Sequence, residues 1–347
     1  MTNNIIIDEL NKMIIAVNKE MKETKNKTLG FKIRSYRKTI GIIKTLDYTI
    51  VSSSQLKDIK GFGLGTLKKI DEIIETGKLE KTKNIDNKDL NNSKNINDLQ
   101  KITGIGPSKA QKLFSENITL DRLIKIDFDN LNEDDETILS NLTNHQKLGV
   151  KYYHHLEKRI PYNEISKMEL YINKIIKKID SKLNIVICGS YRRKQNDSGD
   201  IDVLIYHTNL KKKGEIEKSL YLSSILQIFI NDNFIVDSLT SINKPSKYMG
   251  FCKLKFHKFI RRIDIRIVPY DSLASSLLYF TGSGEFNKNM RTYALSKGVT
   301  LNEYGIYRLI NKVKTFKIKA KEEKDIFRIL NLEYVAPESR LPSYKFI

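Results

Sequence analysis

The sequence predicts an α+β protein of several domains, with a helical N-terminal part and a mixed sheet in its C-terminal part. Apolar residues recur at helical spacing through residues 1–80. Two Gly-x-Gly turns, at residues 61–63 and 104–106, separate helix-like segments. Strand-like runs follow at residues 185–188, 200–206, 234–240 and 261–268, with a helical stretch at 215–231 among them.

The composition narrows the classes of partner. The chain has 347 residues, with 61 Lys and Arg against 41 Asp and Glu, a net charge of +20. Such an excess points to a polyanion, first a nucleic acid and second an anionic membrane surface. No apolar run reaches the ~18–20 residues that span a bilayer, and residues 1–10 do not resemble a signal peptide. We therefore expect a soluble intracellular protein in which Cys188 and Cys252 are buried thiols.

The two Gly-x-Gly turns each lie between helix-like segments. Gly61 and Gly63 precede a helix over residues 66–74, and Gly104 and Gly106 precede another. Glycines let the backbone approach a DNA phosphate closely, and the N-terminus of the following helix presents N–H groups to it. A single turn of this kind is common in helical hairpins. Two of them in a basic chain favour two sites that grip a DNA backbone without reading its sequence.

Two polar segments interrupt the helical part. Residues 82–97 are rich in Asn, Lys, Asp and Ser and poor in apolar residues, which indicates a linker. Residues 127–136 carry six acidic residues and no basic one, which indicates a solvated connection. The expected division is residues 1–85, a linker at 86–97, and then residues 98–158, 159–270 and 271–347.

The segment from residue 189 to residue 202 carries the strongest chemical signal. A Gly-Ser turn follows an apolar run, and Asp200 and Asp202 lie two residues apart at the start of the next strand. Alternation along a strand puts both carboxylates on one face, where they repel each other unless a cation lies between them. The alternative is a solvated Asp-x-Asp on an edge strand. The Gly-Ser turn favours a Mg²⁺ and phosphate site, because its N–H groups can face a phosphate.

Asp264 is the candidate for a third carboxylate. Residues 261–268 alternate strictly, so that isoleucines face one side and Arg262 and Asp264 the other. A mixed-charge face is usual on a solvated strand. On a strand beside the first one, however, Asp264 would join Asp200 and Asp202. Three carboxylates can hold two divalent ions, one at an oxygen nucleophile and one at a triphosphate.

These motifs resemble those of the family X DNA polymerases, the family of DNA polymerase beta, over nearly the whole chain. The resemblance rests on GSYRR at residues 189–193, SGDID at 198–202, RRIDIR at 261–266, LYFTGS at 278–283, FNKNMR at 286–291 and NEY at 302–304. It implies a lyase-type helical domain, a helical DNA-binding subdomain, a nucleotidyltransferase-type palm with a mixed sheet, and a C-terminal α/β subdomain that selects the nucleotide. The implied activity is DNA-directed DNA synthesis that fills short gaps in base excision repair, together with a 5′-deoxyribose-phosphate lyase.

The resemblance also implies roles for individual residues. Asp200, Asp202 and Asp264 match the carboxylates that ligate the metal ions, and Glu303 and Tyr304 match residues that rearrange when the enzyme closes. Matches to residues that hold the incoming deoxynucleoside triphosphate are Arg159, Ser190, Arg193, Ser198, Gly199, Tyr279, Phe280, Gly282 and Asn287. Matches to residues of the DNA and lyase pockets are Lys32, Tyr36, Gly61, Gly63, Lys81, Gly104, Gly106, Arg262 and Arg291.

Lys69 matches the lysine that forms a Schiff base with the 5′-deoxyribose phosphate, and its alternative role is that of a solvated helix lysine. The chain departs from the family pattern at four positions. Gly65 replaces a phosphate-binding lysine, Phe31 a stacking histidine, Lys194 a glycine and Gly284 an acidic residue. We therefore expect altered 5′-phosphate affinity and altered nucleotide selectivity.

Cofactors and partners follow from the same resemblance. It implies two Mg²⁺ ions, for which Mn²⁺ can substitute, and a monovalent cation at the hairpin turns. It implies a monomer that binds gapped or nicked double-stranded DNA and deoxynucleoside triphosphates and works with DNA ligase and other repair enzymes, without a membrane. The compartment would be the nucleus, or the cytoplasm in a virus or bacterium. Two alternatives stay open, a template-independent nucleotidyltransferase and a non-catalytic DNA-structure-binding protein.

Overall fold

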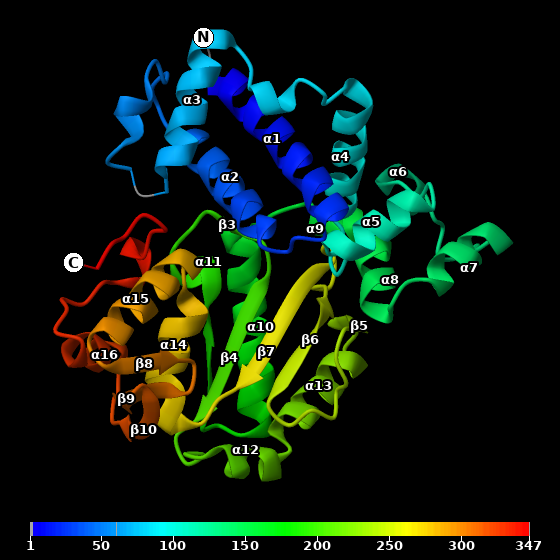
Figure 1. Cartoon of the computed structure of the whole chain (residues 1–347). Helices are drawn as coiled ribbons and strands as arrows, with labels where there is room; N and C mark the ends of the chain where they lie inside the picture. Colours follow the sequence, from blue (N-terminus) through cyan, green and yellow to red (C-terminus); the bar gives the residue numbers. More distant parts are fainter. Residues whose placement is uncertain (1–2, 60, 347) are drawn as a thin grey trace. The chain divides into compact units, whose positions relative to one another are not determined.

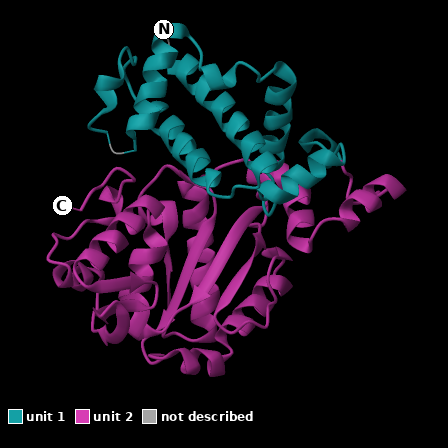
Figure 2. Ribbon diagram, viewed as in Figure 1, with its two compact units in different colours: residues 1–125 teal, residues 126–347 magenta. Residues whose placement is uncertain are grey.

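The computed structural model describes residues 3–59 and 61–346, and the chain divides into two compact units, residues 1–125 and 126–347 (Figure 2). The first unit is helical in its described part, and the second combines helices with a mixed sheet. The predicted α+β class is therefore confirmed. Among the described residues, no helix is both long enough and apolar enough to cross a membrane.

Helices make up the described part of the first unit, and those before residue 80 pack on one apolar core. In chain order they are α1 (Asn3–Thr24), α2 (Leu29–Ile43), η1 (Ser53–Leu56), α3 (Leu64–Thr76), η2 (Glu80–Thr82), α4 (Asn87–Leu99), α5 (Pro107–Ser115) and α6 (Leu120–Leu123) (Figure 1). The core takes one face of α1, α2 and α3, to which Leu10, Ile43 and Ile70 contribute fully buried side chains. Apolar residues at helical spacing thus place the first hairpin on a packed scaffold.

Both predicted Gly-x-Gly hairpins are present in this unit. Gly63 is the N-cap of α3 and Gly106 the N-cap of α5, whose first turn begins with Pro107. Gly61 has a φ of +130° and Gly104 a φ of +90°, a conformation that side chains rarely adopt. A glycine N-cap offers no side-chain oxygen to the first N–H groups of its helix, which leaves these groups to other acceptors.

The segment predicted to be a linker, residues 82–97, is largely the helix α4 instead. The Asp86 carboxylate accepts a hydrogen bond from the backbone N–H of Asp89 at 2.8 Å and caps the helix. The Asp89 carboxylate in turn pairs with Lys19 of α1 at 2.7 Å. A cap and an ion pair therefore outweigh the low apolar content of this segment. The domain boundaries themselves remain a prediction.

A five-stranded mixed sheet is the centre of the second unit. It follows α7 (Glu133–Ser140), α8 (Asn144–Lys151) and α9 (Tyr153–Leu156). Its strands lie in the order β2 (Leu183–Ile187), β4 (Ile201–His207), β7 (Arg261–Ile267), β6 (Lys247–Cys252) and β5 (Ile235–Ser238) (Figure 1). β4 and β7 run parallel, and the other neighbours run antiparallel. The acidic segment 127–136 is not only a connection, because α7 begins inside it with Asn132 as its N-cap.

One face of this sheet is covered by α10 (Tyr162–Ile179) and α13 (Tyr221–Asn231), against which the isoleucines of β4 and β7 are buried. Leu220, with a φ of +55°, separates α13 from α12 (Lys213–Ser219). The single helix predicted over residues 215–231 is therefore two. Cys188 and Cys252 are buried free thiols, as expected, and burial raises the pKa of both.

The C-terminal part of this unit has a core of its own. Its elements are η3 (Tyr270–Ser272), α14 (Leu273–Thr281), α15 (Gly284–Ser296), β8 (Val299–Asn302), β9 (Gly305–Ile310), β10 (Val313–Ile318), α16 (Glu323–Ile329) and η4 (Pro337–Ser339). The three strands form an antiparallel sheet in the order β10-β9-β8. Two short elements border the five-stranded sheet near Asp202, the turn α11 (Gly189–Arg192) and a two-stranded pairing of β1 (Ile160–Pro161) with β3 (Asp197–Ser198).

Candidate active site

The parallel pair β4–β7 brings two of the predicted carboxylates together. Asp202 and Asp264 are direct partners in the strand register, and Asp200 lies two residues before Asp202. Asp202 and Asp264 line one small cavity together with Cys188 and Phe280. Because side chains alternate along a strand, all three carboxylates belong to the face opposite the buried isoleucines.

The electrostatics of this face indicate a place for a cation. Burial, followed by the charges of Asp200 and Asp264, raises the pKa of Asp202 to about 7. Burial also raises the pKa of Asp200, with the charge of Asp264 adding to the shift and the charges of Arg262 and Arg159 opposing it. Oδ1 of Asp264 is buried, and no group of the described residues forms a hydrogen bond to it. Carboxylates in such surroundings bind a proton or a metal ion.

The three carboxylates are not yet arranged around an ion. Within the described ranges, no group of three His, Cys, Asp or Glu side chains has a geometry that could hold a metal. A reason lies at Asp264, whose Oδ2 accepts a hydrogen bond from Arg262 Nη2 at 3.2 Å. Binding of an ion through Oδ2 of Asp264 therefore requires this pair to open, whereas Oδ1 is free of such a partner among the described residues.

The Gly-Ser turn passes directly over Asp202. Gly189 has a φ of +57°, and a Cβ atom on it would lie 2.6 Å from Asp202 Oδ2. Only glycine fits there on both counts. The turn presents Ser190, whose Oγ accepts a hydrogen bond from Arg193 Nη2 at 3.2 Å. Arg193 also donates to the backbone oxygen of Thr281 at 2.5 Å, which joins the turn to the end of α14 beside Gly282.

Arg159 is held by a residue that the sequence reasoning did not select. Its Nε and Nη2 lie 2.9 and 2.8 Å from Oδ1 of Asp197. Its Nη1 lies 2.9 Å from the place where a Cβ on Gly199 would be, and the preceding Ser198 is buried. Arg159, Ser198 and Gly199 are thus brought together next to Asp200. Only the strand pairing reveals Asp197, because 38 residues separate it from Arg159.

Lys194 has a specific partner at the edge of the same loop. It has a φ of +58°, a backbone conformation in which glycine is more usual. Its Nζ donates to the hydroxyl of Tyr162 at 2.9 Å, and Tyr162 stacks on Tyr191 with ring centres 4.4 Å apart. This hydrogen bond raises the pKa of Lys194.

Tyr279 and Phe280, predicted together to hold the incoming nucleotide, point to different places. Tyr279 lines an open groove of about 370 Å³, and its backbone oxygen accepts a hydrogen bond from Asn287 Nδ2 at 2.6 Å. Gly284 and Arg291 line the same groove, together with Lys288, Thr292 and Leu295. Phe280 instead packs towards Asp202 and Asp264, with the guanidinium of Arg266 4.9 Å from its ring centre.

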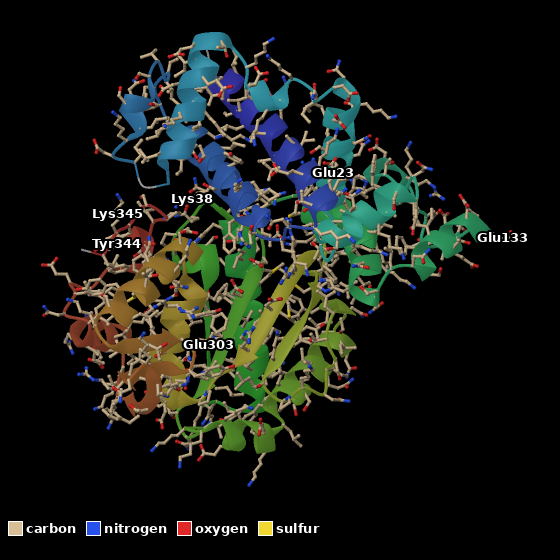
Figure 3. All side chains as sticks on the ribbon, viewed as in Figure 1. Glu23, Lys38, Glu133, Glu303, Tyr344 and Lys345 are labelled. Atoms are coloured by element: carbon tan, nitrogen blue, oxygen red, sulfur yellow. The ribbon has the colours of Figure 1, made fainter. Side chains whose placement is uncertain are left out.

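Glu303 and Tyr304 form the turn between β8 and β9, and Figure 3 labels Glu303 there. Their backbone oxygens accept hydrogen bonds from α14 and the turn before it, Glu303 from Ser276 at 2.8 Å and Tyr304 from Ser272 at 2.9 Å. The helix that carries Tyr279 is thereby tied to this turn.

A buried ion triad beside the Gly-Ser turn was not anticipated. Glu323 of α16 accepts hydrogen bonds from Arg192 of α11 and from Arg340, whose side chain is fully buried. Burial alone would raise the pKa of Glu323, but its hydrogen bonds and charge contacts with the two arginines more than offset this, and the pKa lies below its ordinary value. The separation of 131 residues between Arg192 and Glu323 leaves no local sequence signal.

The remaining predicted residues lie in the first unit. Lys69 is on α3, and its Nζ donates to the backbone oxygen of Gly65 at 3.2 Å. Lys32 and Tyr36 are one turn apart on α2, and Lys81 is in η2. Tyr36 is buried, which raises its pKa, with a further contribution from Glu20.

Lys38 is a further basic residue at the first hairpin. A Cβ atom on Gly61 would lie 3.1 Å from Lys38 Cε and 3.5 Å from its Nζ. The side chain projects from α2 (Figure 3). The helix period alone could have suggested it, because Lys38 lies one helical turn before Ile42, whose side chain approaches the same glycine.

Comparison with known proteins matches three family models along the chain. They are the DNA polymerase beta palm over residues 159–270, the DNA polymerase beta thumb over 276–341, and a helix-hairpin-helix domain over 1–79. All three carboxylates and the Gly-Ser turn fall inside the palm match, and Tyr279 and Arg291 inside the thumb match.

Similar proteins belong to two kinds. DNA polymerase lambda of Rattus norvegicus is 31% identical over 314 residues, which cover 88% of this chain and 52% of the relative. DNA polymerase lambda of Arabidopsis thaliana is 29% identical over 321 residues, 88% of this chain and 57% of the relative. A DNA nucleotidylexotransferase of Xenopus laevis is 26% identical over 369 residues, 98% of this chain and 68% of the relative. The chain thus spans little more than half the length of the two polymerases.

Proposed function

The chain belongs to the family X DNA polymerases, the family of DNA polymerase beta, and on that premise we propose that it is a DNA-directed DNA polymerase that fills short gaps during base excision repair. The observation that carries the proposal is the register of β4 and β7, which sets Asp202 beside Asp264 with Asp200 close by. Nucleotidyl transfer needs charge stabilisation and positioning more than a covalent nucleophile, and this face offers both.

The donors on this face fit a hard divalent cation, which we propose to be Mg²⁺, with Mn²⁺ as a substitute. Family X polymerases generally use divalent metal ions. Three carboxylates supply only oxygen, and Asp264 Oδ1 lacks a partner among the described residues. The pKa of Asp202 is raised by burial and, after that, by the charges of Asp200 and Asp264, and a bound cation would stabilise the charged form against both effects. When bound, such an ion supplies Lewis-acid stabilisation at phosphate oxygens. Asp200, Asp202 and Asp264 would hold it.

The residues around the carboxylates would bind and orient the deoxynucleoside triphosphate. Ser190 and Arg193 are already joined to each other, so a phosphate group would meet a preorganised hydroxyl and guanidinium. Arg159 lies against Gly199 and would reach the distal phosphates. The unpartnered Oδ1 of Asp264 would accept a hydrogen bond from the primer 3′-hydroxyl.

The groove beside Tyr279 would take the sugar and base of the new pair. Its Tyr279–Asn287 hydrogen bond fixes the wall of the groove, and Arg291 supplies a donor that can reach a base edge in the minor groove. At Gly284 a Cβ atom would meet nothing within 4 Å. The absence of a side chain there would leave the incoming base without a contact from this position.

The two hairpins of the first unit would grip the DNA backbone. Gly63 and Gly106 precede helices whose first N–H groups can donate to phosphate oxygens. Lys38 lies against Gly61 and adds positive charge at the first hairpin. Gapped or nicked duplex DNA would be the substrate, and a monovalent cation at either turn would be held by backbone oxygens.

A lyase activity of the first unit is part of the proposal. Lys69 Nζ is the candidate nucleophile, and its hydrogen bond to the Gly65 oxygen holds it on one face of α3. The amine would add to the C1′ aldehyde of a 5′-deoxyribose phosphate and lose water to form an imine. Loss of a proton from C2′ would then break the C3′–O bond and release the DNA strand with its phosphate, and hydrolysis of the imine would free the lysine from the sugar that carries the 5′-phosphate. Gly65 offers no cation to that phosphate, so we expect weak binding and slow release.

The match to a DNA nucleotidylexotransferase favours a second candidate function, addition of nucleotides without a template. One experiment compares the two. Primer extension is measured on a single-nucleotide gap with each deoxynucleotide in turn, and on a single strand of the same sequence. A templated enzyme adds the complementary nucleotide to the gap and extends the single strand far more slowly. Comparable rates on both substrates, without preference for the complementary nucleotide, would favour the second candidate.

A further inference from the structure

Arg159 and Asp197 form an ion pair whose geometry is specific. Nε and Nη2 of the guanidinium both approach Oδ1 of Asp197, at 2.9 and 2.8 Å, and Nη2 also lies 3.4 Å from the Asp197 backbone oxygen. Asp197 therefore occupies the side of the guanidinium that carries Nε. The opposite nitrogen, Nη1, lies against Gly199.

The backbone beneath this pair is fixed. Pro161 is paired with Asp197 and Ile160 with Ser198 in the β1–β3 pairing, and the N–H of Tyr162 donates to the oxygen of Asn196 at 3.0 Å. Ile160 and Ser198 are almost completely buried. The Cα atoms of Arg159 and Asp197 are thus held in place, while their side chains are about half exposed. The hydrogen bonds to Asp197 restrict the rotamers of the long arginine side chain.

This pair aims the arginine at one place. Gly199 separates Asp197 and Ser198 from Asp200, so a guanidinium held against Gly199 lies at the edge of the carboxylate face. Glycine matters here because a Cβ at this position would lie 2.9 Å from Nη1 and displace the guanidinium. Asp197 holds one side of the arginine, and the side with Nη1 remains directed at Gly199.

We propose that Asp197 is a positioning residue for nucleotide binding, which holds Arg159 with Nη1 directed at the site of the triphosphate. The proposal rests on the proposed polymerase function. Asp197 touches neither the substrate nor a cation, and it acts by removing the rotamer freedom that Arg159 would otherwise lose on binding. An exposed ion pair contributes little by itself, so its loss should change nucleotide affinity by about two- to fivefold.

The test compares four variants in primer extension on a single-nucleotide gap: Arg159→Ala, Asp197→Ala, Asp197→Asn and the double variant Arg159→Ala/Asp197→Ala. Asp197→Ala should raise the KM for the nucleotide by about two- to fivefold with kcat unchanged. The double variant should match Arg159→Ala, because Asp197 acts only through the arginine. Asp197→Asn keeps an oxygen that accepts from Nε and Nη2, and its KM should stay within about twofold of the wild type.

Two results would overturn the inference. A KM that falls or does not change in Asp197→Ala, while it rises in Arg159→Ala, would mean that Asp197 competes with the nucleotide or does nothing. Additive effects in the double variant would mean that Asp197 does not act through Arg159.

Calorimetric binding of dATP with Mg²⁺, without DNA, separates this inference from the proposed function. If dATP binding depends on Arg159 and Asp197 as described but no primer is extended, the polymerase proposal fails and the positioning role stands. If primers are extended but nucleotide binding is the same in Asp197→Ala as in the wild type, the positioning role fails and the polymerase proposal stands.

Discussion

Replacing Glu323 by glutamine should destabilise the second unit strongly. Glu323 is only 6% exposed and accepts hydrogen bonds from Arg192 and from the fully buried Arg340. Nη2 of Arg340 is already buried without a partner among the described residues. Glutamine keeps the shape but removes the negative charge, which leaves two guanidinium groups close together in the interior.

The magnitude follows from this burial. Removing one partner of a buried ion pair costs about 3–5 kcal/mol, because the remaining charge stays desolvated and unpaired. For a unit of the size of residues 126–347 this corresponds to a fall in Tm of roughly 6–20 °C. The effect should also reach the Gly-Ser turn, because Arg192 adjoins Arg193. We therefore expect a higher KM for the nucleotide in the variant.

Thermal unfolding followed by circular dichroism at neutral pH measures the effect, with Glu217→Gln as the matched control. Glu217 forms an exposed pair with Lys213, so its loss should change the stability by less than about 0.5 kcal/mol. Because the pKa of Glu323 is lowered in the folded protein, its stabilisation is present above about pH 4.5 and is lost as the pH falls through the folded value. A Tm for Glu323→Gln equal to that of the control would refute the argument.

Three further predictions concern the two sites. Because the pKa of Asp202 is raised to about 7, the metal-free protein should lose stability as the pH rises from about 4 through 7. Mg²⁺ should therefore raise the Tm more at about pH 8 than at about pH 6. An equal rise in Tm at the two pH values would contradict the proposed metal site. Gly189→Ala should abolish primer extension, since its Cβ would lie 2.6 Å from Asp202 Oδ2 at a φ of +57°; normal activity of the variant would show that the turn does not lie so close. Borohydride should trap the Schiff base between the protein and a 5′-deoxyribose-phosphate substrate in Lys68→Ala but not in Lys69→Ala, because the Gly65 oxygen holds Lys69 on its face of α3. Undiminished trapping in Lys69→Ala would assign the nucleophile to another amine.

Much of the carboxylate face can be predicted from local patterns. Two-residue alternation places Asp200 with Asp202 and directs Asp264 away from the isoleucines of β7, and the structure has both. The pairing of β4 with β7 is a tertiary event, so the partnership of Asp202 and Asp264 was a hypothesis until the register was known. The two hairpins could also be predicted from the sequence, because a backbone position with positive φ is usually occupied by glycine, as at Gly61 and Gly104.

Local sequence patterns did not predict the structure where contacts between residues far apart in the sequence stabilise it. Residues 82–97 look like a linker because they lack apolar residues, yet a capping box at Asp86 and the ion pair of Asp89 with Lys19 support a helix. The single helix expected over 215–231 breaks at Leu220, which no glycine or proline marks. The ion pairs of Arg159 and Glu323 join residues far apart in sequence, and no period or motif records such pairs.

Gap filling by Asp264→Asn is the most direct test of whether the carboxylate face is the site of nucleotidyl transfer. The variant keeps the size of the side chain and removes one of the three charges that would hold the divalent ions. On a single-nucleotide gap with Mg²⁺, the wild type and Glu217→Gln should insert the complementary nucleotide, and Asp264→Asn should be slower by about a thousandfold or more. Insertion by Asp264→Asn at the rate of the wild type would contradict the assignment of this carboxylate face as the site of nucleotidyl transfer.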